Sequence, residues 1–112
     1  TLINFWATWC APCVEELPSL DKLVTKFGKN NINIIAINVE KIKKEKAINF
    51  LKNIKIKNFT TYFDDKFEVA KLLKLRGIPI TIIINSEGKE IARVVGSLEF
   101  DSKIFIDKLD QL

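Results

Sequence analysis

The chain has 112 residues, enough for one domain and too few for two, and its 47% hydrophobic and 29% charged residues exclude a disordered chain. Histidine is absent, which excludes histidine-activated nucleophiles and most zinc and haem sites. The net charge is +4, but the lysines are dispersed among 14 acidic residues, so we expect no nucleic-acid partner.

The chain opens with a predicted strand that leads into a long helix. Leu2 to Trp6 is short, apolar and aromatic, which is typical of a buried strand. A helix follows from about Pro12 to Phe27, because proline is tolerated in a first helical turn and Gly28 is suited to a C-cap. Pro18 is expected to kink this helix. Its inward face is predicted to consist of Val14, Leu17, Leu20, Val24 and Phe27.

The middle of the chain continues the alternation of strands and helices. Ile32 to Val39 is apolar enough to predict a central strand of a covered sheet. A helix is predicted from Lys43 to Asn53, a short strand from Phe59 to Phe63, and a further helix from Phe67 to Leu75.

The last third of the chain changes to an antiparallel pattern. Thr81 to Ile84 and Glu90 to Val95 predict a hairpin around the turn at 85–88. A final helix is expected from Ser102 to Leu109, with Ile104, Phe105 and Leu109 facing inward. This order predicts an α/β fold, a three-layer sandwich in which helices flank a mixed central sheet.

Both cysteines lie in one motif, Trp9-Cys10-Ala11-Pro12-Cys13. Two cysteines cannot complete a structural zinc site, which needs four ligands. A purely structural disulfide would close a very short loop and contribute only about 2 kcal/mol. A pair that cycles between dithiol and disulfide is therefore favoured. Cys10, at the start of the helix, is expected to be the nucleophile because the helix dipole favours its thiolate, and Cys13 is expected to be the buried resolving thiol.

The segment Phe5 to Cys13 resembles the active-site motif of the thioredoxin superfamily. Three further marks agree in position and order: Pro18, the segment Gly77-Ile78-Pro79, and Gly96. Within the superfamily, Asn4 to Cys10 and Cys13 to Pro18 are similar to the signature of the TlpA/ResA-like group of membrane-tethered, extracytoplasmic proteins. The helix and strand at about 41–62 match the insertion of that group. The resemblance covers essentially the whole chain and implies a thioredoxin-like fold.

The resemblance also implies a function. We expect a thiol–disulfide oxidoreductase that works in the reducing direction on protein disulfides outside the cytoplasm, with no cofactor and no metal. Its partners would be apocytochrome c or a copper chaperone of cytochrome oxidase assembly, and a membrane dithiol would supply electrons. Residues 1–112 are expected to be a monomeric domain, preceded in this group by further strands and an N-terminal anchor.

The remaining site residues are assigned mainly by this likeness. Trp9 is expected to form a surface platform beside the sulfurs, whereas Trp6 is expected in the core. Ala11 and Pro12 place no polar group between the thiols, which argues against a strongly oxidising pair, and we assign both to the substrate-binding surface.

Two further positions follow from the same likeness. A cis bond at Pro79 would place the backbone groups of Ile78 beside the sulfurs, where they can pair with a substrate peptide. Glu16 shares a helix face with Cys13 and matches an active-site acid of the group. Asn4 stands where cytosolic thioredoxins keep a buried aspartate, so the proton-transfer role is expected to fall to Glu16.

Two alternatives remain open. A general cytosolic thioredoxin is disfavoured by Asn4 and by the insertion at 41–62. A Cu(I) carrier that binds the metal through both thiolates is the other alternative. Related copper proteins use a wider cysteine spacing and a histidine, which this chain lacks.

Overall fold

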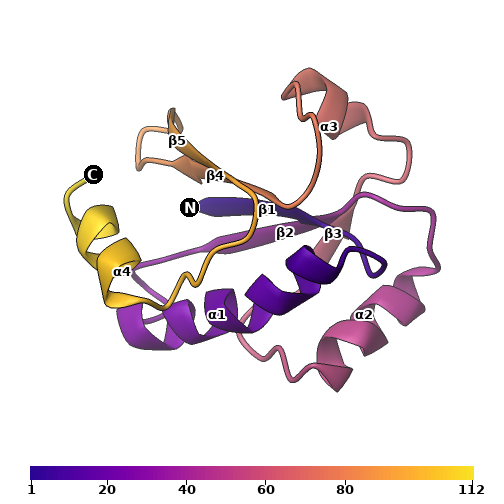
Figure 1. The fold of residues 1–112 in the computed structure, drawn as a ribbon, viewed down its shortest axis with the longest axis horizontal. Coiled ribbons are helices and arrows are strands. Elements are labelled where there is room, and N and C mark those ends of the chain that lie inside the picture. Colours follow the sequence, from indigo (N-terminus) through magenta and orange to yellow (C-terminus); the bar gives the residue numbers. More distant parts are fainter.

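A five-stranded sheet with the order β3-β2-β1-β4-β5 runs through the middle of the molecule (Figure 1). The computed structural model describes residues 1–112 without a gap. β1 (Leu2–Trp6), β2 (Ile34–Asn38) and β3 (Thr61–Phe63) are parallel. β4 (Ile80–Ile84) is antiparallel to β1, and β5 (Glu90–Val95) is antiparallel to β4. The predicted mixed sheet is confirmed, including the change from parallel to antiparallel pairing.

Four helices cover the two faces of this sheet. α1 (Ala11–Phe27), α2 (Lys44–Asn53) and α4 (Lys103–Asp110) lie on one side, and α3 (Glu68–Leu72) lies on the other (Figure 1). The molecule is therefore the three-layer sandwich that the sequence predicts. No helix combines the length and the apolar character needed to cross a bilayer.

The core divides at the sheet because side chains alternate between its faces along each strand. Leu2 and Trp6 of β1 belong to the larger cluster, beneath α1, α2 and α4, whereas Phe5 belongs to the smaller cluster on the other face. Leu73 and Leu75, directly after α3, pack against this second cluster. Trp6 and Phe5 are thus completely buried, one on each face of the sheet. Their packing positions the carboxyl end of β1 and the turn that follows it.

The predicted insertion is an integral part of the sheet. β3 pairs with β2, and the indole N–H of Trp6 donates a hydrogen bond to Thr61 Oγ1 at 3.0 Å. Both side chains are buried. The first and third strands are thus joined through side chains across β2, in addition to the ladder of backbone hydrogen bonds.

Two predicted details are wrong. Ile104 is 72% exposed, because Phe105 and Leu109 share one helix face at a spacing of four residues and Ile104 lies at its edge. The third helix is shorter than predicted, since Phe67 and Lys74 on either side of it adopt positive φ angles of 58° and 57°. Such left-handed residues interrupt a helix.

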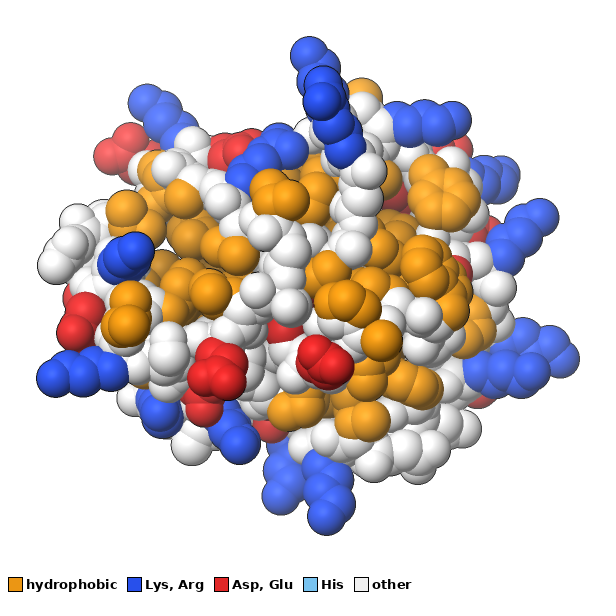
Figure 2. Space-filling view, in the orientation of Figure 1, with side chains coloured by type: hydrophobic (Ala, Val, Ile, Leu, Met, Phe, Trp, Pro, Cys, Tyr) orange, Lys and Arg blue, Asp and Glu red, His pale blue; other side chains and the backbone are white.

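On the face drawn in Figure 2, the charged side chains are dispersed and do not form a stripe. In the face drawn in Figure 2, lysine and arginine side chains project around the whole outline, and acidic side chains lie among them. Hydrophobic side chains occupy the central part of this face.

Candidate active site

The two cysteines lie in the turn between β1 and α1 and in the first turn of that helix. Cys10 is the N-cap residue of α1, and its Sγ accepts a hydrogen bond from the backbone N–H of Cys13 at 3.3 Å. The two sulfurs form a disulfide, with their Cα atoms 5.3 Å apart. The unpaired N–H groups at the start of a helix favour negative charge, so this position suits a thiolate.

The exposure of the two cysteines differs in the predicted direction but by a small amount. Cys10, the expected nucleophile at the helix start, has only 5% of its surface accessible in the disulfide form. Cys13 is completely buried, as expected. Of the two residues, only Cys10 is accessible from outside.

Trp9 stands out from the surface beside the disulfide. It is 70% exposed, in contrast to the buried Trp6, and both placements confirm the predictions. Trp9 contributes to two surface hollows, one of about 300 Å³ that it shares with Ile78 and one of about 530 Å³ that it shares with Glu40. The structure therefore brings Trp9 and Ile78 together, whereas Ala11 and Pro12 are exposed in the first helical turn and line neither hollow.

The loop before β4 has the backbone conformation that the resemblance implies. The peptide bond between Ile78 and Pro79 is cis. The Pro79 carbonyl accepts a hydrogen bond from the backbone N–H of Gly96 at 2.9 Å, and Gly96 has a positive φ of 90°. The segment that follows β5 is thus attached to the proline loop.

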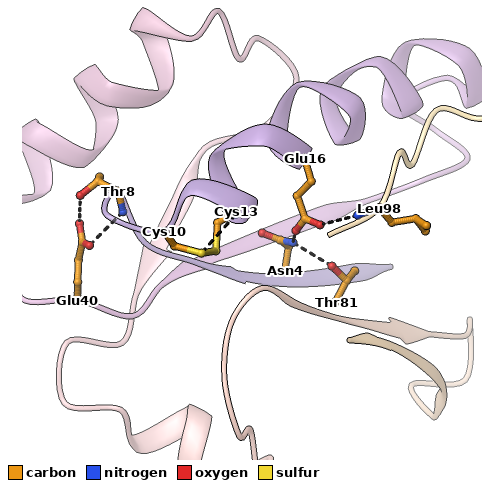
Figure 3. Close-up of a disulfide and its surroundings, with 8 residues drawn as sticks. All are labelled: Asn4, Thr8, Cys10, Cys13, Glu16, Glu40, Thr81 and Leu98. Atoms are coloured by element: carbon orange, nitrogen blue, oxygen red, sulfur yellow. Dashed lines mark hydrogen bonds between the residues drawn. A yellow bond between two sulfur atoms is a disulfide. The ribbon is translucent and has the colours of Figure 1, made fainter. Parts of the chain in front are cut away.

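Glu16 is buried under the sheet at the centre of a hydrogen-bond network. Only 2% of its surface is exposed. Its Oε2 accepts a hydrogen bond from Asn4 Nδ2 at 2.6 Å, and its Oε1 accepts one from the backbone N–H of Leu98 at 3.3 Å (Figure 3). Asn4 Nδ2 also donates to Thr81 Oγ1 at 2.9 Å. The Glu16 carboxylate therefore binds Asn4 and the Leu98 backbone directly, and Thr81 joins the network through Asn4.

Burial changes the acidity of Glu16. Loss of hydration raises the pKa of Glu16 to about 7, although the hydrogen bonds from Asn4 and from the Leu98 backbone act in the opposite direction. The neighbouring Glu15 is exposed. Glu16 can therefore gain and lose a proton near neutral pH, which is the range that general acid–base work requires.

Residues 1–92 match the model of the AhpC/TSA family. The chain belongs to that family. It is similar to the thiol-disulfide oxidoreductase ResA of Bacillus subtilis (strain 168), with 33% identity over 96 residues, and to ResA of Bacillus cereus, with 31% identity over 102 residues. These matches cover 86% and 84% of this AhpC/TSA-family chain and 52% and 53% of the two relatives. The chain thus spans about half the length of the curated relatives it matches.

A solved structure from Chlorobium tepidum, described as a thiol:disulfide interchange protein DsbE, is also similar. It has 26% sequence identity and a TM-score of 0.84, and the match covers 98% of this chain and 77% of that one. This likeness confirms the thioredoxin-like fold that the sequence indicates for this member of the AhpC/TSA family.

Sequence reasoning missed three residues of the site in this AhpC/TSA-family chain. Thr81 and the Leu98 backbone complete the surroundings of Glu16, and the carboxylate of Glu40 holds the turn before Cys10. A signal for Glu40 was present, because it closely follows a parallel strand next to β1, and the carboxyl ends of such strands meet at one edge of the sheet. Thr81 had no comparable signal, since its contact depends on strand register, and Leu98 had none because it lies in the loop after β5.

Proposed function

We propose that this chain is a thiol–disulfide oxidoreductase that reduces disulfides of other proteins. The observation that carries the proposal is the Cys10–Cys13 pair, closed as a disulfide at the N-terminus of α1, with Cys10 as the accessible member. The similarity to ResA and the TlpA/ResA-like signature around the motif support the same activity.

The reaction proceeds through two exchanges. The Cys10 thiolate attacks one sulfur of the substrate disulfide, which forms a Cys10–substrate disulfide and releases the other substrate sulfur as a thiolate. Cys13 then loses its proton and attacks Cys10 Sγ, so that the Cys10–Cys13 bond forms and the second substrate sulfur leaves as a thiolate. Two electrons pass from the enzyme dithiol to the substrate disulfide, so the two cysteines carry the whole redox step.

Glu16 takes the proton that Cys13 must lose in the second exchange. It lies three residues after Cys13 on the buried side of α1, and its pKa of about 7 allows it to accept a proton at neutral pH and to release it later. The chain has no histidine for this task, and position 4 carries an amide rather than a carboxylate. Glu16 therefore acts as the general base of the resolving step.

The substrate lies against Trp9 and the proline loop. Trp9 and Ile78 share the smaller hollow, so an extended substrate segment can rest on the indole while it pairs with the backbone at Ile78, next to Pro79. Ala11 and Pro12 are exposed in the first turn of α1 and contact the substrate from the side of the helix.

The place and partners of the reaction follow from the likeness to the TlpA/ResA-like group. The protein works on the outer side of a bacterial membrane, tethered by a segment before Thr1, and acts as a monomer. Its substrates are the haem-site cysteines of apocytochrome c or the cysteines of a copper chaperone, and a membrane dithiol returns it to the reduced state.

A trapping experiment tests the function. In the Cys13→Ser variant the second exchange cannot occur, so we expect substrates from an extracytoplasmic extract to remain attached to Cys10 and to be identified by mass spectrometry. The reduced wild-type chain should also accelerate the reduction of insulin disulfides by dithiothreitol. A Cys10→Ser, Cys13→Ser double variant is the matched control. A Cys13→Ser protein that captures no more than this control, together with an uncatalysed insulin reaction, would rule the function out.

A further inference from the structure

The side-chain carbonyl of Asn4 has no hydrogen-bond partner, although the residue is completely buried. The same side chain uses its Nδ2 fully, since that atom donates to both Glu16 and Thr81. Buried polar atoms in native proteins are paired with few exceptions, and each exception calls for an explanation. The unpaired Oδ1 of Asn4 lies within the site proposed above for proton transfer.

The planar amide determines where this unpaired atom points. Since Nδ2 is directed at Glu16 and Thr81, Oδ1 on the same planar group must be directed away from the carboxylate. Figure 3 shows Asn4 between the disulfide and Glu16, with its oxygen on the side of Cys13. Cys13 and Asn4 are both completely buried, so water from outside does not reach the space between them.

The redox state explains why the oxygen lacks a donor. In the disulfide form neither sulfur carries a hydrogen, so the Cys13 side chain has nothing to donate. Reduction places an S–H group on Cys13, and a thiol is a weak hydrogen-bond donor. The acceptor that is unpaired in the oxidised chain thus gains a donor in the reduced chain.

We propose that Asn4 is a positioning residue for the resolving step, whose Oδ1 accepts the S–H of Cys13 in the dithiol state while its Nδ2 holds the Glu16 carboxylate. This inference rests on the proposed function and deepens it. The amide places the proton donor and the proton acceptor on its two sides. When Cys13 attacks Cys10 Sγ, its S–H first turns about the Cβ–Sγ bond from Oδ1 toward Glu16, and the Glu16 carboxylate then takes up the proton. The Cys10–Cys13 bond forms as the bond from Cys10 to the substrate breaks. An amide suits this place because one planar group offers both a donor and an acceptor.

The wavenumber of the infrared S–H stretching band of Cys13 reports directly on the proposed hydrogen bond. In a Cys10→Ala background Cys13 is the only thiol, and we expect its band at the lower wavenumber of a bonded S–H. Asn4→Leu, which keeps the size but removes the amide, should move the band upward to the unbonded position. Thr81→Val is the matched control, because it removes another partner of Asn4 and leaves Oδ1 in place. In Thr81→Val the S–H band should remain at the wavenumber of the parent protein.

A kinetic measurement connects the bond to the reaction. With both cysteines present, Asn4→Leu should slow the release of substrate from the Cys10–substrate disulfide about fivefold, because the Glu16 carboxylate loses the Nδ2–H that holds it. The first attack by Cys10 should change little. Asn4→Ala, which cannot overfill the site, replaces Asn4→Leu in both measurements if the leucine variant does not fold.

The outcomes separate this inference from the proposed function. Equal band positions in the parent and the Asn4 variants, or equal slowing of both exchange steps, would overturn the role of Asn4. The infrared band requires no activity, so a shifted band together with failed substrate trapping would leave the hydrogen bond established and the proposed function refuted.

Discussion

The carboxylate of Glu40 accepts two hydrogen bonds from Thr8, one from the backbone N–H at 3.0 Å and one from the hydroxyl at 2.6 Å (Figure 3). Glu40 is buried just beyond β2, and Thr8 lies two residues before Cys10. The turn that presents Cys10 is thus attached to the neighbouring parallel strand. Asn38 Oδ1 in turn accepts the backbone N–H of Glu40 at 3.1 Å, which holds the carboxylate in place.

Removing this attachment should loosen the cysteine turn. We expect Glu40→Ala to lower the free energy of unfolding by about 1–3 kcal/mol, because the backbone N–H of Thr8 loses its partner. Reduction of a protein disulfide should slow as well. Denaturant unfolding and an insulin assay measure the two effects. Glu87→Ala, at an exposed turn between β4 and β5, is the control. Equal losses in the two variants would contradict the role of Glu40.

Alkylation should distinguish the two cysteines. In the reduced chain at neutral pH, we expect iodoacetamide to modify Cys10 well before Cys13, because Cys10 is the accessible residue and the N–H groups of the helix start favour its thiolate. Peptide mass spectrometry over a time course gives both rates. The same reaction in guanidinium should abolish the difference. Equal or reversed rates in the folded protein would show that Cys10 is not the nucleophile.

Burial of Glu16 should make stability depend on pH. Its pKa is raised from 4.5 to about 7 on folding, so between these values the folded chain holds a proton that the unfolded chain has lost. Stability therefore falls as pH rises through this window, by up to about 3 kcal/mol relative to a residue that does not titrate. Glu16→Gln should remove this slope, as measured by urea unfolding between pH 4.5 and 7.5. Glu15→Gln, at an exposed position, should keep it.

The same pair of variants tests the proton transfer. We expect Glu16→Gln to change the pH dependence of disulfide exchange near neutral pH, because the resolving step loses the general base proposed for it. The pH dependence of disulfide exchange by Glu15→Gln should match that of the wild type. If neither variant alters the curve, Glu16 has only a structural role and the proton leaves Cys13 by another route.

Trp9 offers a test of substrate binding that is separate from chemistry. Because Trp9 is 70% exposed, Trp9→Ala should leave the free energy of unfolding within about 0.5 kcal/mol of the wild type. KM for a protein disulfide should rise severalfold, whereas the rate with glutathione disulfide should stay nearly unchanged. Tyr62→Ala is the control, since Tyr62 is similarly exposed and lines neither hollow beside Trp9. An unchanged KM in the Trp9 variant would remove Trp9 from the binding surface.

The sequence by itself determined the features that depend on near neighbours along the chain. Periodicity and breakers located every strand and helix, since apolar spacing and glycine or proline act within a few residues. The spacing of the cysteines at a helix start indicated both the chemistry and the order of attack. Ile104 and Phe105 show the limit of this reasoning, because both are apolar and adjacent on one helix, yet only Phe105 is buried. Which of two such neighbours faces the core depends on the surface that the helix packs against.

The tertiary structure alone decided what surrounds those cysteines. Glu16 is bonded to Asn4, 12 residues away, and to Leu98, 82 residues away, while Asn4 reaches Thr81 across 77 residues. Thr8 and Glu40 are separated by 32 residues. These contacts arise from sheet order and strand register, and a register shift of one residue would turn each strand side chain to the opposite face. The raised pKa of Glu16 and the unpaired oxygen of Asn4 exist only because that register closes the site to water.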